Sequence, residues 1–348
     1  MSQSPSHRIL VIRRRYLGDI VLLGPVFRNL RLHWPAARLV ALVEWAYAPV
    51  LAMNPDVDET LVLPRRSVEW PAFVRQLRRA NFTQVLDLDN NDRTALLARL
   101  TGAPCRVALW HEGNGARWRR FYTAAVHDLP DIHERRSIVD YYLAVLGAVD
   151  VPIASREVRL VPRPGDLESA RKLAPQDRRK LLLHPGSRSP WRVWPVENFA
   201  ALADRLQDEL AIQVFVIGGP GEQGMVAAIK QQAHSHLVTI NAPLSIPQFA
   251  AFAAQFSVML CHDSGPMHVA AAVGTHIIGL LGSQNPVLFA PPGPGHVLLQ
   301  PPLPCVTCVA PSLCAPGDSY HNYCVRNISV DRVFDTARRF FATASARS

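Results

Sequence analysis

The sequence contains almost no lysine. Only Lys172, Lys180 and Lys230 occur among 37 basic side chains, so nearly all of its cations are arginine. With 28 acidic side chains, the formal net charge is +9. Guanidinium groups suit bidentate contacts to phosphates and carboxylates, which favours an anionic ligand or an anionic membrane surface as partner. A codon bias toward arginine explains the same composition equally well.

Long apolar segments are also missing. No uninterrupted run reaches the length of a membrane span, and the opening "MSQSPSHRILVIRRRY" lacks the order of charge, apolar segment and cleavage site of a signal peptide. We therefore expect a cytoplasmic protein, with peripheral contact at the inner face of the cytoplasmic membrane as its only membrane association. No nucleic-acid motif occurs and the arginines are scattered along the sequence, so we expect no nucleic-acid partner.

Apolar runs of strand length alternate with helical patterns in both halves of the chain. Strands are expected at 8–13, 38–44, 59–64, 83–89, 105–110, 180–186, 213–219, 237–241, 257–263 and 276–282. Helices are expected at 19–34, 45–53, 70–80, 93–102, 195–210, 221–233, 246–255, 265–273 and 330–344. The segment 151–179, rich in proline and charge, is the predicted linker.

The strand runs are almost continuous in Val, Ile and Leu, which indicates parallel sheets covered by helices on both faces. A length of 348 residues, with 49% hydrophobic and 19% charged residues, favours two globular domains. We predict an α/β fold with two doubly wound parallel-sheet domains, residues 1–163 and 164–348. The second would include the cysteine-rich loop 305–324 and a terminal helix.

In such sheets, ligands bind beyond the carboxyl ends of the strands. Ser187 and Arg192 follow the strand 180–186, in a turn whose backbone N–H groups and arginines can meet a phosphate. Glu222 follows the next strand and could accept hydrogen bonds from ribose hydroxyls. The alternatives are a helix-start loop with solvated arginines and, for Glu222, a carboxylate facing a helix dipole.

The stretch "CHDSGPMHVAAAVG" forms a third turn of this kind. Asp263 and Ser264 end a buried strand, Gly265 permits close approach of a ligand, and the following helix presents His268 one turn in. Such a turn can hold hydroxyl groups with its carboxylate and a diphosphate at the helix N-terminus. Routine helix capping and a core histidine are the alternatives. The three turns share one predicted sheet edge, and together they predict a nucleotide-diphosphate site.

Three ordered motifs carry a resemblance to a known family. They are "RRRYLGDIVLLGPVFRNLRLHWP", "HPGSRSPWRVWPVENFAAL" and "HDSGPMHVAAAVGTHIIGLLGSQNP". Over nearly its whole length the chain resembles glycosyltransferase family 9, the ADP-heptose:lipopolysaccharide heptosyltransferases. The resemblance implies a GT-B architecture, with an N-terminal acceptor domain and a C-terminal donor domain facing a central cleft. It also implies an inverting, metal-independent transfer of heptose from ADP-heptose to an inner-core lipopolysaccharide sugar.

The resemblance assigns a role to Asp19. In the family, the aspartate of the "LGD" motif is the proposed general base, which takes the proton of the acceptor hydroxyl as that oxygen attacks the anomeric carbon. The alternative is an N-cap aspartate beside solvated arginines. Arg13, Arg14 and Arg15 would lie on the acceptor side and attract anionic sugars or phosphates. Many members carry small hydroxyl residues there, so Arg14, Arg15 and Tyr16 point to a different acceptor.

The resemblance also implies the donor contacts. Arg192 stands where the family has a lysine that touches the diphosphate, and Ser187 matches a small hydroxyl residue near the phosphates. Glu222 matches the ribose-binding acid and Asp263 a residue that contacts the donor sugar. Gly265 and His268, with Ser264 beside them, belong to the segment that grips the diphosphate. Together these groups would stabilise the charge that develops on the leaving ADP.

Four of the six cysteines cluster near the C-terminus, at Cys305, Cys308, Cys314 and Cys324. In a cytoplasmic protein such a cluster favours a metal site or free thiols over disulfides. The first pair has ligand-like C-x-x-C spacing, but the second is spread wider than in zinc ribbons. A protein-modifying branch similar to the family holds iron through cysteines. A structural Zn or Fe and unligated thiols both remain open, and catalysis itself is expected to need no cofactor.

Cys105 and Cys261, near strand ends, are expected to be small buried hydrophobic residues. Three alternative functions compete with heptose transfer to lipopolysaccharide. The acceptor could be a protein or another surface glycan. The fold could serve a nucleotide-binding protein without transferase activity. A nicotinamide oxidoreductase is disfavoured because the G-x-G-x-x-G fingerprint is missing.

Overall fold

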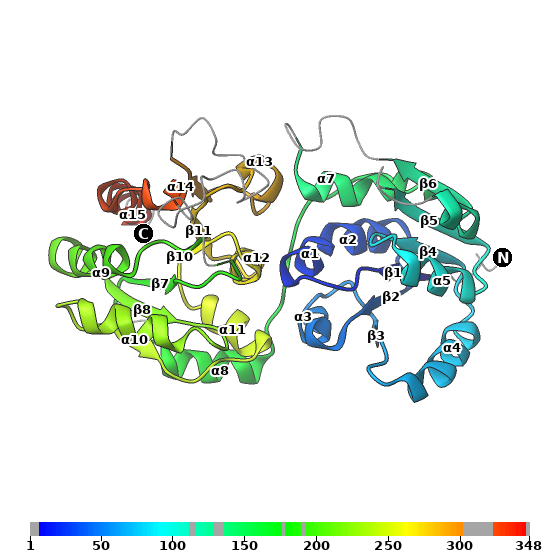
Figure 1. Ribbon diagram of the computed structural model, residues 1–348, viewed down its shortest axis with the longest axis horizontal. Helices are drawn as coiled ribbons and strands as arrows, with labels where there is room; N and C mark the ends of the chain where they lie inside the picture. Colours follow the sequence, from blue (N-terminus) through cyan, green and yellow to red (C-terminus); the bar gives the residue numbers. More distant parts are fainter. Residues whose placement is uncertain are drawn as a thin grey trace. The chain divides into compact units, whose positions relative to one another are not determined.

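The computed structural model describes residues 7–110, 116–127, 136–175, 178–189, 192–301 and 323–345. The chain divides into two compact units, Met1–Val161 and Pro162–Ser348. Each unit is built on a six-stranded parallel sheet with helices on both faces (Figure 1). The predicted fold class, two Rossmann-like parallel-sheet domains, is confirmed.

In the first unit the strand order is β3-β2-β1-β4-β5-β6. The strands are β1 (Arg8–Ile12), β2 (Arg38–Val43), β3 (Glu59–Val62), β4 (Gln84–Asp87), β5 (Cys105–Trp110) and β6 (Ala124–His127). This is the doubly wound order, in which the direction of strand addition reverses between the first and fourth strands. β1 pairs with both β2 and β4. Its Ile9 lies opposite Leu39 of β2 on one side and opposite Gln84 of β4 on the other. The switch point of the unit therefore lies between β1 and β4.

Two layers of helices cover the first sheet. The helices are α1 (Leu17–Leu22), α2 (Gly24–His33), η1 (Trp45–Tyr47), α3 (Ala48–Leu51), η2 (Ser67–Glu69), α4 (Trp70–Arg79), α5 (Asp92–Leu100), η3 (Ala116–Phe121), α7 (Ile138–Leu143) and η4 (Ala144–Val149). The expected helix 19–34 is two helices, because Pro25 lacks the N–H that a continuous helix needs. β6 and α7 were not predicted.

The second unit repeats the topology of the first, with the order β12-β11-β10-β7-β8-β9. Its strands are β7 (Lys180–His184), β8 (Gln213–Ile217), β9 (Val238–Ile240), β10 (Val258–His262), β11 (His276–Leu280) and β12 (Val297–Leu299). β7 pairs with β8 and β10, so the switch point lies between β7 and β10. β12 was not predicted, and its three residues carry too little pattern to stand out.

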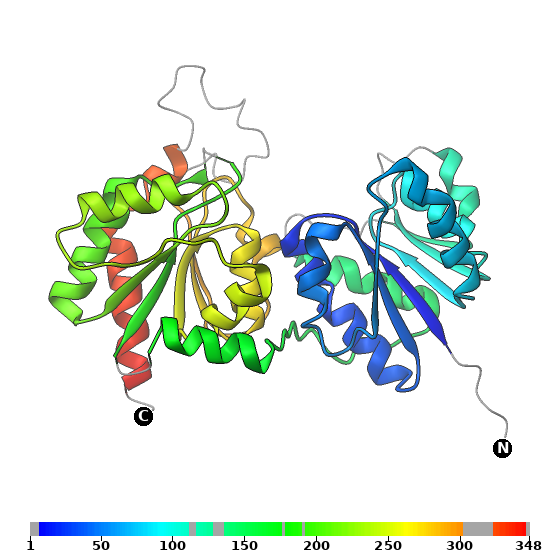
Figure 2. The same ribbon diagram turned by 90° about the horizontal axis from the view of Figure 1, so that it is seen from below.

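The helices of the second unit also form two layers (Figure 2). They are α8 (Pro164–Leu173), α9 (Val196–Leu210), α10 (Gln223–Gln232), α11 (Ile246–Ala253), α12 (Gly265–Ala272), α13 (Pro286–Phe289), α14 (Tyr323–Arg326) and α15 (Val330–Ser345). α9 contacts α10 and α15, and α11 contacts α8 and α12. The expected terminal helix is α15, which buries Phe334 and Phe341 in the core.

The prediction that 151–179 is only a linker was wrong. Pro164–Leu173 forms α8, which starts with a proline at its first position and packs on α11. Further upstream, the buried side-chain amide of Asn29 donates to the Ser155 carbonyl at 2.7 Å and accepts from the backbone N–H groups of Ala154 and Ser155. The proline and the charged residues of this segment suggested a loop. The helix carries little apolar pattern that could reveal it, because Ala170 is its one buried residue.

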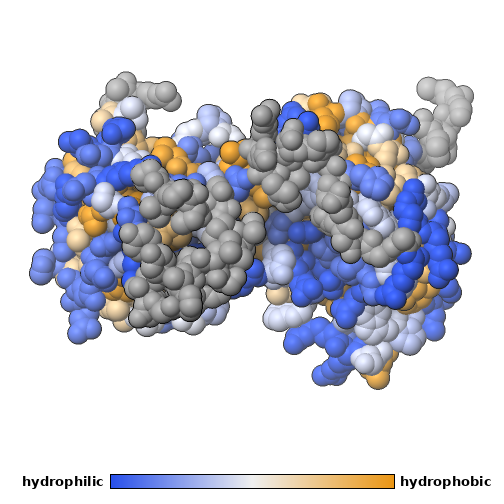
Figure 3. Space-filling view, turned by 45° about the horizontal axis from the view of Figure 1, so that its top comes forward, coloured by the Kyte–Doolittle hydropathy of each residue, from blue (hydrophilic) through white to orange (hydrophobic). Residues whose placement is uncertain are grey.

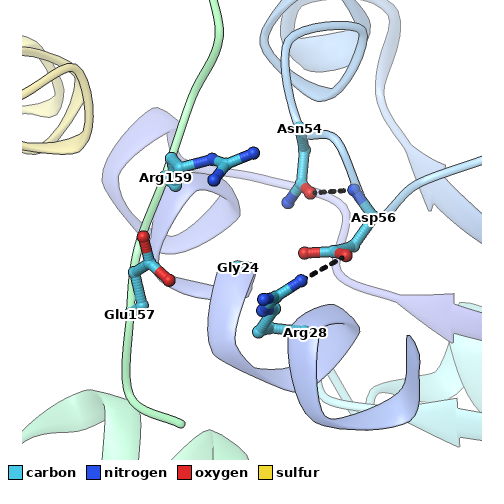
Figure 4. A pocket seen from close by; sticks show the side chains of 6 residues that line it. All are labelled: Gly24, Arg28, Asn54, Asp56, Glu157 and Arg159. Atoms are coloured by element: carbon cyan, nitrogen blue, oxygen red, sulfur yellow. Dashed lines mark hydrogen bonds and ion pairs between the residues drawn. The ribbon is translucent and has the colours of Figure 1, made fainter. Parts of the chain in front are cut away.

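The same segment closes a small polar pocket in the first unit (Figure 4). Its lining consists of Gly24, Arg28, Asn54, Asp56, Glu157 and Arg159. Its volume is about 10 Å³, room for at most about one water molecule. Arg28 and Asp56 form an ion pair of 3.4 Å across the pocket. Its volume makes the pocket too small for a substrate.

No helix in the described ranges combines the length and apolarity needed to cross a bilayer. On the face drawn in Figure 3, hydrophobic residues form small groups among hydrophilic ones.

Candidate active site

Asp19 lies at the switch point of the first unit. It is the third residue of α1, directly after the loop that leaves β1. The N-cap of α1 is Tyr16, whose φ of 72° is unusual for a residue with a side chain. Asp19 is therefore not the N-cap, and that alternative interpretation was wrong.

Two side chains hold the Asp19 carboxylate. Arg13 places Nη2 3.0 Å from Asp19 Oδ1, and the Tyr142 hydroxyl donates to the same oxygen. Burial raises the pKa of Tyr142 well above its usual value, so the phenol keeps its proton and remains a donor. The Asp19 side chain is 21% exposed. Both of these contacts reach Oδ1.

Asp89, which follows β4, binds two of the three predicted acceptor-side arginines, Arg13 and Arg14. Its carboxylate lies 3.3 Å from Arg13 Nη1 and accepts from Arg14 Nε at 2.8 Å and from the Arg14 backbone N–H at 3.1 Å. Arg14 also lies 3.5 Å from Glu44, and Arg15 lies 3.7 Å from the same carboxylate. Arg13 and Arg14 are thus largely buried in ion pairs. Arg15, with half of its side chain exposed, is the most accessible of the three.

Asp87 shapes the turn that presents Asp89. It ends β4, is fully buried, and accepts hydrogen bonds from the backbone N–H groups of Asp89 and Asn90 and from the Tyr122 hydroxyl at 2.6 Å. Burial raises the pKa of Asp87 to about 6. Asp87, Asp89 and Tyr142 were missed from the sequence. The "LDLD" at the end of an expected strand was a usable signal for the first two, because it falls at the edge where ligands bind.

The buried Asp87 predicts a pH dependence of stability. Its pKa rises from 3.8 to about 6 on folding, so the unfolded chain ionises first and stability falls as pH increases through this window. The difference corresponds to about 3 kcal/mol. We expect Asp87→Asn to gain up to this amount relative to wild type between about pH 4 and about pH 7, measured by urea unfolding. Parallel pH profiles of the two proteins would contradict the prediction.

The predicted donor residues meet at the switch point of the second unit. Ser187 follows β7 and is half-buried, while Asp263 follows β10. Arg192 places Nη1 3.7 Å from Asp263 Oδ2. Burial lowers the pKa of Arg192; Asp263 opposes this, and Arg188 adds to it, so a second guanidinium lies near the first. Two cations and a small-residue turn thus lie at one edge of the sheet.

Buried contacts fix the loop that carries Arg192. Trp194 is fully buried, and its indole N–H donates to the Ile328 carbonyl at 2.8 Å. The Trp194 backbone N–H donates to His262 Nε2 at 3.1 Å, so His262 carries its proton on Nδ1, which donates to the Leu280 carbonyl. Burial lowers the pKa of His262 to about 4, which keeps this arrangement at neutral pH.

Ser264 stands at the N-cap of α12 without capping it. Its backbone is extended, but its side chain makes no cap hydrogen bond. The Ser264 Oγ atom is buried and has no hydrogen-bond partner within the described ranges. Capping by Ser264 was therefore the wrong alternative. Gly265 opens α12, and His268, 5% exposed, is buried one turn further on.

Glu222 occupies the space left by a glycine. Its Oε2 accepts from the Gly219 backbone N–H at 2.7 Å and lies 3.4 Å from His184 Nε2. Burial lowers the pKa of His184, so the ring is neutral. A Cβ on Gly186 would lie 1.9 Å from Glu222 Oε1. Glu222 is the N-cap residue of α10, but its side chain makes no cap hydrogen bond and instead accepts from the loop after β8. This position at a helix N-terminus leaves the helix-dipole alternative open beside ribose binding.

The cysteine cluster lies mostly outside the described residues, which exclude Cys305, Cys308 and Cys314. Cys324 is half-buried. Among the residues that the structure describes, no group of three or more His, Cys, Asp or Glu could hold a metal ion. The metal site stays a prediction. Cys261 is fully buried as expected, whereas Cys105 is only partly so.

Comparisons with known proteins identify the family of the chain. A family model described as glycosyltransferase family 9 (heptosyltransferase) matches residues 70–312. Lipopolysaccharide heptosyltransferase 3 of Escherichia coli is 23% identical over 291 residues, which cover 80% of this chain and 84% of that protein.

Solved structures show the same fold. A family 9 glycosyl transferase from Veillonella parvula superimposes with a TM-score of 0.85 at 22% identity, covering 99% of this chain and 100% of that one. ADP-heptose lps heptosyltransferase II of E. coli gives a TM-score of 0.77 at 22% identity, covering 97% and 99%. The GT-B fold class is thereby confirmed.

The chain belongs to glycosyltransferase family 9, the heptosyltransferase family, as its three motifs predicted. The oxidoreductase alternative does not hold for a member of this family.

Proposed function

We propose that the protein transfers a heptose from ADP-heptose to an inner-core sugar of lipopolysaccharide, with inversion at the anomeric carbon. The observation that carries the proposal is the position of the motif residues. Asp19 lies at the switch point of the first unit, and Ser187, Arg192 and Asp263 lie at that of the second. Doubly wound sheets bind nucleotides and their substrates at such points.

The second unit would bind the donor. The turn Gly186–Ser187, the Ser264 hydroxyl and the N-terminal end of α12 would take the diphosphate, because exposed N–H groups and the helix dipole favour anions. Arg192 would neutralise its charge, and Gly265 and His268 would form the adjoining wall. Glu222 would accept from the ribose hydroxyls, and Asp263 would contact the heptose. The buried Ser264 hydroxyl has no hydrogen-bond partner among the described residues, which costs free energy that a phosphate oxygen would recover.

The first unit would bind the acceptor and supply the base. Asp19 Oδ2 takes the proton of the acceptor hydroxyl while that oxygen forms a bond to the anomeric carbon. The bond from this carbon to ADP breaks on the opposite face, and ADP leaves with the electron pair. Arg13 and Tyr142 orient the carboxylate through Oδ1. No catalytic cofactor takes part, so cations and amide dipoles stabilise the leaving diphosphate.

The exposed residues beside Asp19 bear on the identity of the acceptor. Arg15 and Tyr16 are exposed beside Asp19, at positions where many family members carry small hydroxyl residues. A bulkier and more basic loop supports an acceptor with its own arrangement of anionic groups. A protein or another surface glycan is therefore the second candidate, and acceptor profiling distinguishes it from lipopolysaccharide.

An ADP-release assay tests the proposal. We expect release from ADP-heptose only when a truncated lipopolysaccharide with an exposed inner core is present. Failure of the purified protein to bind either ADP or ADP-heptose would contradict the proposal. Binding without turnover, on every glycan and protein acceptor tried, would leave a nucleotide-binding protein without transferase activity.

We further propose that the enzyme works in the cytoplasm, in peripheral contact with the inner face of the cytoplasmic membrane. A lipopolysaccharide precursor is anchored in a bilayer by its acyl chains, so the enzyme must reach its acceptor there.

A further inference from the structure

One helical layer of the first unit is strongly basic. α4, α5 and η3 pack over the same hydrophobic cluster on one side of the sheet; α4 contacts α5, and α5 contacts η3. Figure 1 shows α4 next to α5. The three helices carry one acidic residue, Asp92, against eight exposed arginines. The arginines are Arg75, Arg78, Arg79, Arg93, Arg99, Arg117, Arg119 and Arg120. We call this surface the basic helical face.

Packing points these arginines outward. α4 buries Phe73 and Leu77, and α5 buries Leu97, in the core beneath the layer. Of the eight arginines, only Arg117 has a carboxylate partner within the described ranges: Asp92, at 2.9 Å. Both members of that pair are about two-thirds exposed, where ion pairs are weak. Within the part of the chain that the structure describes, the positive charge of the basic helical face is therefore almost unneutralised.

Aliphatic side chains stand among the arginines. Val68, in η2 just before α4, is 82% exposed, and Leu96, between the two arginines of α5, is 46% exposed. Arginines interspersed with exposed aliphatic residues suit a bilayer surface, where guanidinium groups meet lipid phosphates and apolar tips enter the interface. Nucleic-acid surfaces use aromatic stacking and groove contacts, and the aromatic rings of these helices are at least partly buried.

We propose that the basic helical face docks the enzyme on bilayers that contain anionic lipids. The proposal deepens the proposed function, in which the acceptor is lipid-borne, and it uses none of the residues assigned to donor or catalysis. Each arginine near an anionic surface strengthens binding about fivefold, and the effect fades within a Debye length, about 10 Å in 0.1 M salt.

Vesicle flotation with the purified full-length chain tests the proposal. We expect binding to phosphatidylcholine vesicles that contain phosphatidylglycerol, and little binding to phosphatidylcholine alone. The triple variant Arg75→Gln, Arg78→Gln, Arg79→Gln should bind the anionic vesicles about 100-fold more weakly. The control Arg171→Gln, Lys172→Gln, Lys230→Gln removes the same charge from exposed positions on α8 and α10 and should bind like wild type.

We call the Arg75→Gln, Arg78→Gln, Arg79→Gln protein the α4 variant. Equal binding of the wild type to neutral and anionic vesicles, or equal losses in both triple variants, would overturn the docking proposal. So would an α4 variant that binds vesicles like the wild type but has lost binding to a DNA duplex, because the face would then be a nucleic-acid surface. ADP release with a delipidated, water-soluble acceptor separates this proposal from the proposed function. The α4 variant should keep that activity, which also shows that it is folded. Turnover without vesicle binding removes only the docking role, whereas vesicle binding without any turnover removes only the transferase role.

Discussion

Replacing Asp19 by asparagine is expected to lower heptose transfer by about three orders of magnitude, the range for loss of a general base. Asparagine keeps the size of the side chain and an oxygen that can accept from Tyr142, but it cannot take the acceptor proton. The affinity for ADP should stay unchanged, because the proposed donor residues belong to the second unit. Turnover is measured by ADP release, and affinity by calorimetric titration with ADP.

Asp150→Asn is the matched control. Asp150 is an exposed aspartate of the same unit, and its left-handed backbone (φ 56°) accommodates asparagine readily. It should retain full turnover. If Asp19→Asn turned over at the wild-type rate, the proton would have to leave by another route, and the assignment of Asp19 as base would be wrong.

Replacing Gly186 by alanine is expected to weaken ADP binding roughly 10- to 100-fold, as for a lost hydrogen bond to a charged group. The new methyl would lie within 2.2 Å of three atoms of the Glu222 carboxylate, so this side chain must move away from the proposed ribose site. The carboxylate is the end of a flexible side chain and can move, but it then loses the hydrogen bond from the Gly219 N–H, so the free energy of unfolding should fall by about 1.5 kcal/mol. ADP titration and thermal unfolding measure the two effects.

A double-mutant cycle tests whether Gly186→Ala weakens ADP binding by displacing the Glu222 carboxylate. If alanine acts by displacing the carboxylate, Glu222→Ala alone should weaken binding similarly, and Gly186→Ala should add little in that background. Gly224→Ala, where the added methyl meets no atom within 4 Å, is the control and should bind ADP normally. Additive losses in the cycle would show that Gly186 acts independently of Glu222.

The proposed donor residues of the second unit were the more predictable ones. Ser187, Glu222 and Asp263 each follow a strand, and the carboxyl ends of parallel strands meet at one edge, so inspection of those turns was sufficient to propose them. In the first unit, the family motif pointed to Asp19, whereas Asp87 and Asp89 were not predicted as site residues. The rule that site residues follow the carboxyl ends of parallel strands applies to β4 as well. Asp89, which follows β4, forms ion pairs with Arg13 and Arg14.

Other features had no local signal. α7 was not expected, and without it Tyr142 could not be connected with Asp19. The eight arginines of the basic helical face are spread along the sequence, which argued against any single charged surface. Folding gathers them because α4, α5 and η3 all bury their apolar sides against one face of the same sheet.

Local patterns of the chain were enough for the parallel α/β class, the family and most residues of the proposed donor site, because strands, turns and motifs are written in neighbouring residues. The hydrogen bond from Tyr142 to Asp19 joins residues 123 positions apart, and that from Arg14 to Asp89 joins residues 75 apart. Such contacts depend on strand order and helix packing, which no short segment encodes. Which groups orient the carboxylate, and which side of the first unit is charged, therefore emerged only from the folded chain.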